Sequence, residues 1–169
     1  AAQVPAIGFQ GEVSREVAGL FGIRSATKVT YRSGDQPNNA YSLNASQEGD
    51  VAVTAGTSAV LYALTRKQAA DEKSRVNTFV HPRLASETPL QGILACLNGG
   101  GKWHSWLKNI LGVQSSTFNY AQMDALAQKV SAGSEGVMVF PFGNGPERLL
   151  NNRDIGAQMA GIRFNVHDA

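Results

Sequence analysis

The chain has 169 residues, of which 43% are hydrophobic and 17% charged, a composition typical of a globular protein with a real core. Its 15 basic and 13 acidic residues give a formal charge of +2 without a long run of one sign, so neither nucleic acid nor an acidic membrane surface is indicated as a partner. The single cysteine, Cys96, excludes an internal disulfide, and without a signal-peptide pattern or an apolar run near the ~20 residues of a membrane helix we expect a cytoplasmic protein.

The N-terminal part predicts short elements. Residues 1–11 are apolar and punctuated by proline and glycine, which is typical of a segment that enters from something upstream. Ser14 is placed as the N-cap of a brief helix, and Gly22 as its C-terminal cap. Val29–Tyr31 then predicts a short strand.

A turn with a carboxylate follows this strand. Ser33, Gly34 and Asp35 end the strand, and Pro37 fits the first turn of a helix that we expect from Pro37 to about Ser46. Asp35 is therefore predicted between the end of a strand and the start of a helix, where reacting groups often project from a rigid frame. Taken alone, such an aspartate is more often a turn or cap residue.

The run from Asp50 to Leu64 predicts a β-hairpin. Val51–Ala55 and Ala59–Leu64 are apolar and β-prone, and Gly56, Thr57 and Ser58 form a small tip between them. Such a tip offers successive backbone N–H groups and two hydroxyls, which together can bind phosphate oxygens. A phosphate cradle with a nearby acid, here Asp35, provides the minimal parts of a phosphoryl-transfer site.

The middle of the chain predicts two more strands and two helices. Val76–Val80 and Leu90–Leu97 read as strands, the second apolar enough to be central. Helical spacing relates five apolar residues before Gly112, which ends that helix: Trp103, Trp106, Leu107, Ile110 and Leu111. The next helix begins at Asn119, with Gln122 in the capping box, and is expected to bury Met123, Leu126 and Val130.

The C-terminal part is less regular. Val137–Phe140 predicts a strand that leads into a turn rich in proline and glycine and then to Glu147 and Arg148. Residues 151–169 show no helix pattern strong enough to close a domain. We therefore expect one domain, cut within its sequence, with no internal repeat.

Several sites that are common in other proteins do not fit this sequence. The glycines before Lys102 do not form a Walker loop, because Cys96 and Trp103 occupy required positions, and His104 breaks the dinucleotide pattern. What remains is a glycine-rich turn from strand to helix. This turn has either a purely structural role or lets a phosphate or a flat ligand approach the backbone at the start of the helix. No Gly-x-Ser-x-Gly elbow of a serine hydrolase occurs.

The histidines, tryptophans and cysteine favour structural roles. His81, His104 and His167 do not share metal-ligand spacing, so we predict no metal site, and His81 is expected in a loop rather than as a catalytic base. The two tryptophans lie on the apolar face of their helix and are expected to pack in the core. Cys96 is expected to be a small buried hydrophobic residue.

Five collinear blocks resemble the C-terminal domain of the FGGY family of carbohydrate kinases, and within it the xylulokinases most. The blocks are Tyr31–Ala40, Gly49–Leu64, Leu94–Leu107, Val139–Arg148 and Ile155–Asn165. The resemblance implies an α/β fold: part of an actin-like, ribonuclease-H-like domain, one of two that close around a cleft. It also implies a segment leading in from the N-terminal domain at residues 1–28, and part of the C-terminal domain, on the nucleotide-binding side, at residues 29–169.

By this resemblance Asp35 matches the catalytic aspartate, the general base that accepts a proton from the attacking sugar hydroxyl. Gln36 matches a neighbour that contacts the polyol. The implied reaction is phosphorylation of a ketose by ATP, with D-xylulose to D-xylulose 5-phosphate as the first expectation and a role in xylose metabolism. Alternatives are another FGGY kinase acting on glycerol, ribulose or a related polyol, and a non-catalytic actin-like module that binds nucleotide.

The resemblance also implies a nucleotide site with ATP and Mg²⁺. Gly56, Thr57 and Ser58 match the hairpin that binds the ATP phosphates, and Gly101 and Ser105 match positions near the nucleotide. Glu147 and Arg148 match a Gly-Glu-Arg stretch, although Pro146 intrudes, and we assign them no role. The family's N-terminal domain, with most sugar contacts, and a later glycine-rich segment near the adenine are absent, so we expect the fragment alone to be inactive. Magnesium ligands and oligomeric state stay open, with a homodimer as one option.

Overall fold

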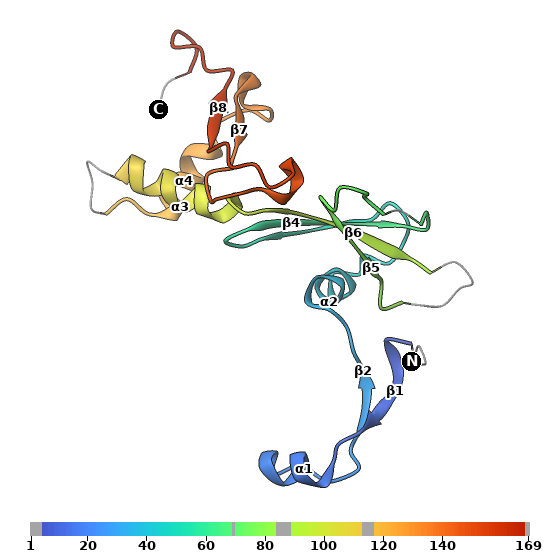
Figure 1. Cartoon of the computed structure of the whole chain (residues 1–169). Coiled ribbons are helices and arrows are strands. Elements are labelled where there is room, and N and C mark those ends of the chain that lie inside the picture. The colour runs from blue at the N-terminus through green and yellow to red at the C-terminus, as the bar shows by residue number, and fades with distance from the viewer. Residues whose placement is uncertain (1–4, 69, 84–88, 113–116, 168–169) are drawn as a thin grey trace. The chain divides into compact units, whose positions relative to one another are not determined.

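The computed structural model describes residues 5–68, 70–83, 89–112 and 117–167, and Figure 1 shows their helices and strands. The chain divides into two compact units. Unit 1 comprises Ala1–Val53, Leu61–Glu72 and Val76–Leu94, and unit 2 comprises Thr54–Val60, Lys73–Arg75 and Ala95–Ala169. Of the N-terminal lead-in expected from the sequence, residues 1–4 lie outside the described residues.

Unit 1 begins with an antiparallel strand pair. Its elements are β1 (Ile7–Glu12), α1 (Arg15–Phe21) and β2 (Lys28–Tyr31). The Ser14 hydroxyl accepts the N–H of Val17 at 3.2 Å, and Gly22 ends the helix in the left-handed region at φ 63°. Both caps lie where the sequence predicts them, and the strand near Val29 is confirmed.

Helix α2 spans Asp35–Ser42 and begins two residues before the predicted start. Oδ1 of Asp35 accepts the N–H of Gln36 at 2.8 Å, and Pro37 falls within the first turn, where an N–H would have no partner in the helix. The expectation that Asp35 precedes the helix is therefore wrong, because it is the first helical residue. The helix ends at Ser42 rather than near Ser46, since Asn44 adopts a left-handed φ of 60°.

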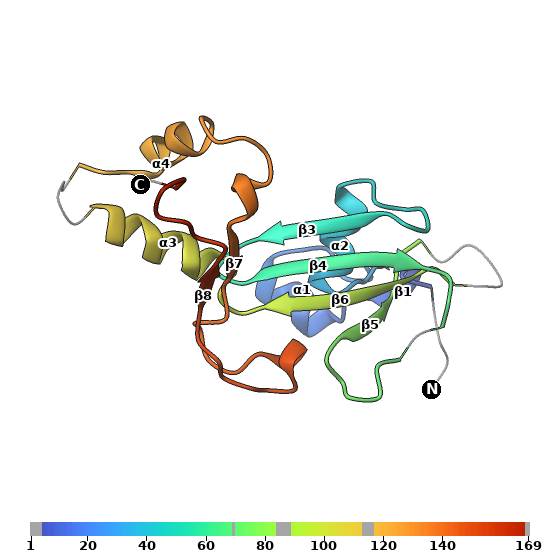
Figure 2. The same ribbon diagram turned by 90° about the horizontal axis from the view of Figure 1, so that it is seen from above.

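The sheet contains β3 (Val51–Ala55), β4 (Ala59–Thr65), β5 (Asn77–Val80) and β6 (Gln91–Leu97), in the order β3-β4-β6-β5. The predicted hairpin is confirmed as β3 and β4, which run in opposite directions in Figure 2. Strand β6 has a neighbour on each side, which confirms its predicted central place, and β5 pairs with it antiparallel.

The core of unit 1 packs α2 and the segment after it against the sheet. Its buried members are Ala40, Ala45, Ala52, Tyr62, Leu64 and Leu90, with Leu94 packed against them. Tyr62 is 1% exposed, and a Cβ at Gly92 would overlap its ring. Burial raises the pKa of Tyr62 to about 12, so the phenol stays neutral in the folded protein across the physiological range.

Asp50 fixes the entry to the hairpin. One carboxylate oxygen accepts the N–H groups of Ser46 at 2.8 Å and Gln47 at 2.9 Å, and these two bonds lower the pKa of Asp50 because they favour its charged form. The backbone continues the hairpin ladder at this point: Leu64 donates to the carbonyl of Asp50, and Gly49 donates to the carbonyl of Leu64, both at 2.9 Å.

His81 lies after β5, outside any helix or strand, as predicted, and it is fully buried. Its N–H donates to the carbonyl of Leu90 at 2.9 Å, and Nδ1 accepts the N–H of Arg83 at 3.2 Å. Desolvation lowers the pKa of His81 below its usual value. The ring therefore serves the packing of unit 1, with Tyr41 at its edge and 5.9 Å between ring centres.

Unit 2 carries most of the C-terminal elements: α3 (Gly100–Leu111), α4 (Tyr120–Ala127), β7 (Met138–Phe140) and β8 (Gln158–Ala160), with the short 3-10 helices η2 (Ser134–Gly136) and η3 (Arg148–Leu150). The capping box of α4 is confirmed: Asn119 accepts the N–H of Gln122 at 3.1 Å, and Gln122 accepts the N–H of Asn119 at 2.9 Å. Strand β8 was not expected from the sequence; it pairs antiparallel with β7.

Three expectations about burial in unit 2 need correction. Trp106 is 53% exposed and Trp103 only half-buried, so neither is a core residue within the described part of the chain. Helix α4 buries Met123 but leaves Leu126 exposed, and Val130, which lies beyond the end of the helix at Ala127, is exposed as well. Cys96 is half-buried rather than fully buried. An apolar stripe identifies the face of a helix that avoids water, but not what covers it.

None of the described helices combines the length and the apolar character needed to cross a membrane. Across the same residues, no three His, Cys, Asp or Glu side chains come together as a group that could hold a metal ion.

Candidate functional site

The glycine-rich turn at the end of β6 is the centre of the candidate site, and it lies within unit 2. Asn98 follows the strand, Gly99 is the N-cap of α3, and Gly100 and Gly101 are its first residues. Each glycine faces another backbone segment so closely that a side chain would collide with it. A Cβ at Gly99 would overlap the carbonyl of Pro141, and one at Gly100 would lie 2.6 Å from Cβ of Ala59.

Gly101 meets the tip of the hairpin. A Cβ there would overlap the carbonyl oxygen of Gly56 and lie 2.8 Å from the carbonyl carbon. The N–H groups of Gly101 and Lys102 both donate to the carbonyl of Thr57, at 3.0 and 3.2 Å. The tip residues Thr54–Val60 belong to unit 2 together with this turn. The three glycines therefore let the hairpin tip and the loop at Pro141 pack directly on the start of α3. This packing agrees with the prediction that the glycine-rich turn serves the backbone.

These hydrogen bonds restrict which groups can bind a phosphate. Two N–H groups in the first turn of α3 are already used by Thr57, and the N–H of Gly56 donates to the carbonyl of Ser58 at 3.1 Å. The start of the helix is therefore not an open anion site at Gly101 and Lys102. The remaining candidate donors at the tip are the hydroxyls and N–H groups of Thr57 and Ser58.

Ser105 lies one turn into α3. Its hydroxyl donates to the carbonyl of Lys102 at 3.0 Å, so in this state it bonds along the helix. Of the residues predicted near the nucleotide, the structure brings Gly56, Thr57 and Gly101 into direct contact within unit 2. Ser105 follows on the same helix.

Asp35 and Gln36 lie together in unit 1, at the start of α2. The Asp35 carboxylate is exposed, and one of its oxygens accepts the N–H of Gln36. The turn before them is fixed by the Tyr31 hydroxyl, which donates to Oδ1 of Asn38 at 2.6 Å. A carboxylate at the first position of a helix also benefits from the positive end of the helix dipole.

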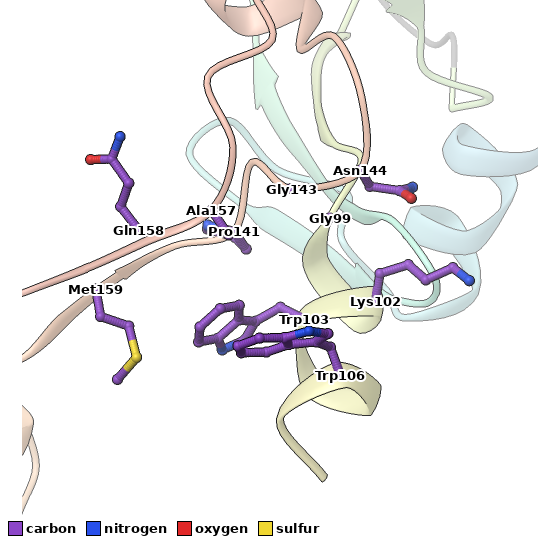
Figure 3. Close-up of a pocket in the computed structure, with 10 residues that line it drawn as sticks. All are labelled: Gly99, Lys102, Trp103, Trp106, Pro141, Gly143, Asn144, Ala157, Gln158 and Met159. Carbon is purple, nitrogen blue, oxygen red and sulfur yellow. The ribbon is translucent and has the colours of Figure 1, made fainter. Parts of the chain in front are cut away.

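A cavity of about 470 Å³ adjoins the glycine-rich turn in unit 2 (Figure 3). Its lining combines apolar and polar side chains, among them Lys102, Trp103, Trp106, Asn144, Gln158 and Met159. The two indole rings lie one over the other in Figure 3, with 5.1 Å between ring centres and 29° between planes. Indole faces of this kind can stack on a flat ring or an apolar group.

The sequence interpretation missed the loop that holds this turn. Glu147 is fully buried, and its carboxylate accepts the N–H of Asn98 at 3.0 and 3.2 Å from its two oxygens. Asn144 donates its side-chain N–H to the carbonyl of Asn98 at 3.0 Å. The signal in the sequence was the position of Glu147 directly after a turn of prolines and glycines. Its contact with Asn98 joins residues 49 positions apart and therefore leaves no local pattern.

Comparisons with known proteins find sequence similarity to sugar kinases. The chain is 26% identical over 159 residues to gluconokinase from Bacillus subtilis, which covers 90% of this chain and 30% of that protein. It is 27% identical over 135 residues to xylulose kinase from Haemophilus influenzae, covering 80% of this chain and 25% of that protein. The chain thus spans less than a third of the length of these relatives. No model of a known protein family matches it.

The fold of the chain is also similar to that of solved sugar kinases. The crystal structure of xylulose kinase from Rhodospirillum rubrum superposes with a TM-score of 0.74 at 22% identity, covering 98% of this chain and 32% of that one. The expected fold class is confirmed: the chain has the α/β fold of part of an actin-like, ribonuclease-H-like domain of a sugar kinase. The resemblance to part of an FGGY carbohydrate kinase, stated above from five sequence blocks, is confirmed as well.

Proposed function

We propose that this chain is part of an ATP-dependent carbohydrate kinase and supplies its general base and part of its nucleotide site. The observation that carries the proposal is the packing of the hairpin tip on the glycine-rich turn, through Gly56, Thr57 and Gly101. This packing joins two of the segments that the family resemblance assigns to the nucleotide. Sequence similarity to a gluconokinase and a xylulose kinase over most of the chain supports the same reaction class.

Asp35 is the proposed base. It accepts the proton of the sugar hydroxyl as that oxygen attacks the γ-phosphate of ATP, and the phosphate is transferred while ADP leaves. An exposed carboxylate held by the Gln36 N–H and by the start of α2 has a defined position and an approach open to substrate. Gln36 is proposed to contact the polyol beside it.

The hairpin tip is proposed to bind the phosphates. With the N–H of Gly56 bound to Ser58 and the carbonyl of Thr57 bound to α3, the tip is stiff before ligand arrives, which lowers the entropic cost of binding. Thr57 and Ser58 would then donate to phosphate oxygens as negative charge shifts during transfer. Gly101 would keep the start of α3 close to the tip, and Ser105 would lie near the nucleotide on the same helix.

Mg²⁺ is the proposed metal cofactor, brought by ATP. This ion usually keeps several waters and binds through substrate phosphates and one or two carboxylates rather than through a protein cage. Among the described residues, no three His, Cys, Asp or Glu side chains form a group that could hold the ion. When bound, the ion would neutralise charge on the phosphates. We assign it no protein ligands.

D-Xylulose is the first candidate substrate, with D-xylulose 5-phosphate as product and xylose metabolism as the setting. A second candidate is gluconate, favoured by the similarity to the gluconokinase, which covers more of this chain than that to the xylulose kinase. Glycerol, ribulose and related polyols remain candidates within the same reaction class.

The remaining proposals concern the whole protein. Residues 1–28 would lead in from an N-terminal kinase domain that carries most sugar contacts, and residues 29–169 would be part of the C-terminal domain. The fragment alone would then lack activity. A cytoplasmic location, expected from the sequence pattern, is proposed, and a homodimer is kept as one option.

A coupled ADP-release screen of the full-length protein tests the function. We expect release that depends on sugar, with the highest kcat/KM for D-xylulose or gluconate among the ketoses, aldonates and polyols tested. A folded full-length protein that binds Mg·ADP but forms no ADP from ATP with any of these sugars would contradict the kinase proposal. That result would favour a non-catalytic nucleotide-binding module, which needs the hairpin but not Asp35.

A further inference from the structure

Glu147 is a fully buried carboxylate with a fixed backbone. Its N–H donates to the carbonyl of Arg153 at 3.0 Å, and its own carbonyl accepts the N–H of Asn152 at 2.9 Å. A buried ionised group is costly unless hydrogen bonds compensate for the lost water. The contact that this side chain makes is therefore informative about its role.

Its carboxylate bonds Asn98, and the 144–147 segment holds Asn98 at three points. The Glu147 carboxylate accepts its N–H, the side-chain N–H of Asn144 donates to its carbonyl at 3.0 Å, and the Asn98 side chain donates to the carbonyl of Pro146 at 2.8 Å. Asn98 is thus fixed through its N–H, its carbonyl and its side chain, by residues of unit 2.

Asn98 is the last residue before three consecutive glycines. Glycine has the largest conformational freedom of any residue, so a run of three does not define its own path. Nevertheless Gly101 must arrive close to the carbonyls of Gly56 and Thr57. An anchor directly before the run determines where the glycines begin. The carboxylate strengthens this anchor, because hydrogen bonds to charged groups are the stronger ones.

We infer that Glu147 is a positioning residue for the nucleotide site: through Asn98 it fixes the glycine-rich turn and thereby the hairpin tip that packs on the turn. This inference rests on the proposed function for the identity of the ligand, Mg·ADP or Mg·ATP. It gives Glu147 a role in affinity for the nucleotide without contact to it.

The test compares Glu147→Gln with Glu48→Gln in the full-length protein. Glutamine keeps one acceptor but loses the charge. Glu48 is a matched control, since its exposed carboxylate accepts the N–H of Arg66 at 3.1 Å in unit 1. Two readouts are measured on each variant: the Kd for Mg·ADP by calorimetry, and hydrogen exchange of the backbone amides of residues 98–102, which needs no ligand.

We expect Glu147→Gln to weaken Mg·ADP about tenfold, equivalent to about 1.4 kcal/mol, and to speed exchange at residues 98–102 while the midpoint of thermal unfolding stays close to that of the parent. Glu48→Gln should change neither the Kd nor the exchange of these amides. Unchanged exchange and Kd in Glu147→Gln would overturn the inference, as would faster exchange with an unchanged Kd.

A second variant covers a failure of Glu147→Gln to fold. Asn144→Ala removes an exposed side chain that bonds the same residue, and it should speed exchange at residues 98–102 and weaken Mg·ADP to a smaller extent. Parent-like values for both readouts would then overturn the inference. A parent protein that binds no Mg·ADP would contradict the proposed function instead, and exchange in the variants would still test the anchor.

Discussion

Gly101→Ala tests the packing on which the candidate site depends. Gly101 lies in helix α3, where alanine has the better intrinsic propensity by up to about 1 kcal/mol. Propensity alone therefore predicts a stabilised protein. The structure predicts the opposite, because the new Cβ would overlap the Gly56 carbonyl oxygen and lie 2.8 Å from its carbon and 3.3 Å from Cα of Thr57.

The expected loss follows from two effects. The obstacle is backbone rather than the end of a flexible side chain, so either the hairpin tip or the start of α3 has to move, at a cost of about 1 to 3 kcal/mol for overpacking. That movement also weakens the bonds from Gly101 and Lys102 to the Thr57 carbonyl, each worth about 1 kcal/mol. After subtracting the gain in propensity, we expect unfolding to become easier by about 2 to 4 kcal/mol.

Urea unfolding followed by tryptophan fluorescence is the assay, since both tryptophans of this chain lie on α3, close to the substitution. Gly19→Ala is the matched control, because Gly19 is also helical, in α1, and a Cβ there would meet nothing within 4 Å. It should be neutral or stabilising by up to about 1 kcal/mol. Equal stability changes in the two variants would refute the packing argument.

Two further predictions concern stability in unit 1. Asp50→Asn should destabilise the protein at neutral pH. Because the pKa of Asp50 is lowered in the folded protein, the stability that its carboxylate contributes is present above the unfolded pKa of 3.8 and is lost as the pH falls through the folded pKa. The difference in stability between parent and variant, measured by urea unfolding, should therefore shrink in acid. Tyr62→Phe should leave stability equal or raise it at pH 7, since the buried hydroxyl finds no hydrogen-bond partner among the described residues. The parent should also lose stability from pH 10 to about 12, where the unfolded phenol ionises first, and the variant should lose less; an identical pH profile would contradict the raised pKa.

The elements that the sequence predicts well are those specified by neighbouring residues. The caps at Ser14 and Asn119 bind N–H groups three positions away, so their patterns are local and complete. The β3–β4 hairpin joins two apolar runs through a three-residue tip, which is also a local arrangement. Asp35 and the tip residues Gly56, Thr57 and Ser58 are also marked by local patterns, as an acid in a turn and a small hydroxyl-bearing tip, and the family resemblance adds their proposed roles as base and phosphate site.

The features that sequence could not provide depend on distant parts of the chain. Strand β8 has three residues and is a strand because it pairs with β7, about twenty positions earlier. Glu147, to which the sequence assigned no role, is buried and bonded to Asn98. Conversely, the stripe that contains Trp106 reads as core but is exposed in the described part of the chain. In these cases the pairing of a strand or the burial of a side chain depends on tertiary packing, which the periodicity of the sequence does not show.

The general base is the central claim, and Asp35→Asn tests it most directly. In a coupled ADP-release assay of the full-length protein with its best sugar, this variant should lower kcat by about 10² to 10⁴, the range typical of losing a general base. The Kd for Mg·ADP should stay within about twofold, because Asp35 is not among the residues proposed to bind the nucleotide. Asp124→Asn, on the exposed surface of α4, is the control and should match the parent. A kcat for Asp35→Asn equal to that of the parent would contradict the account.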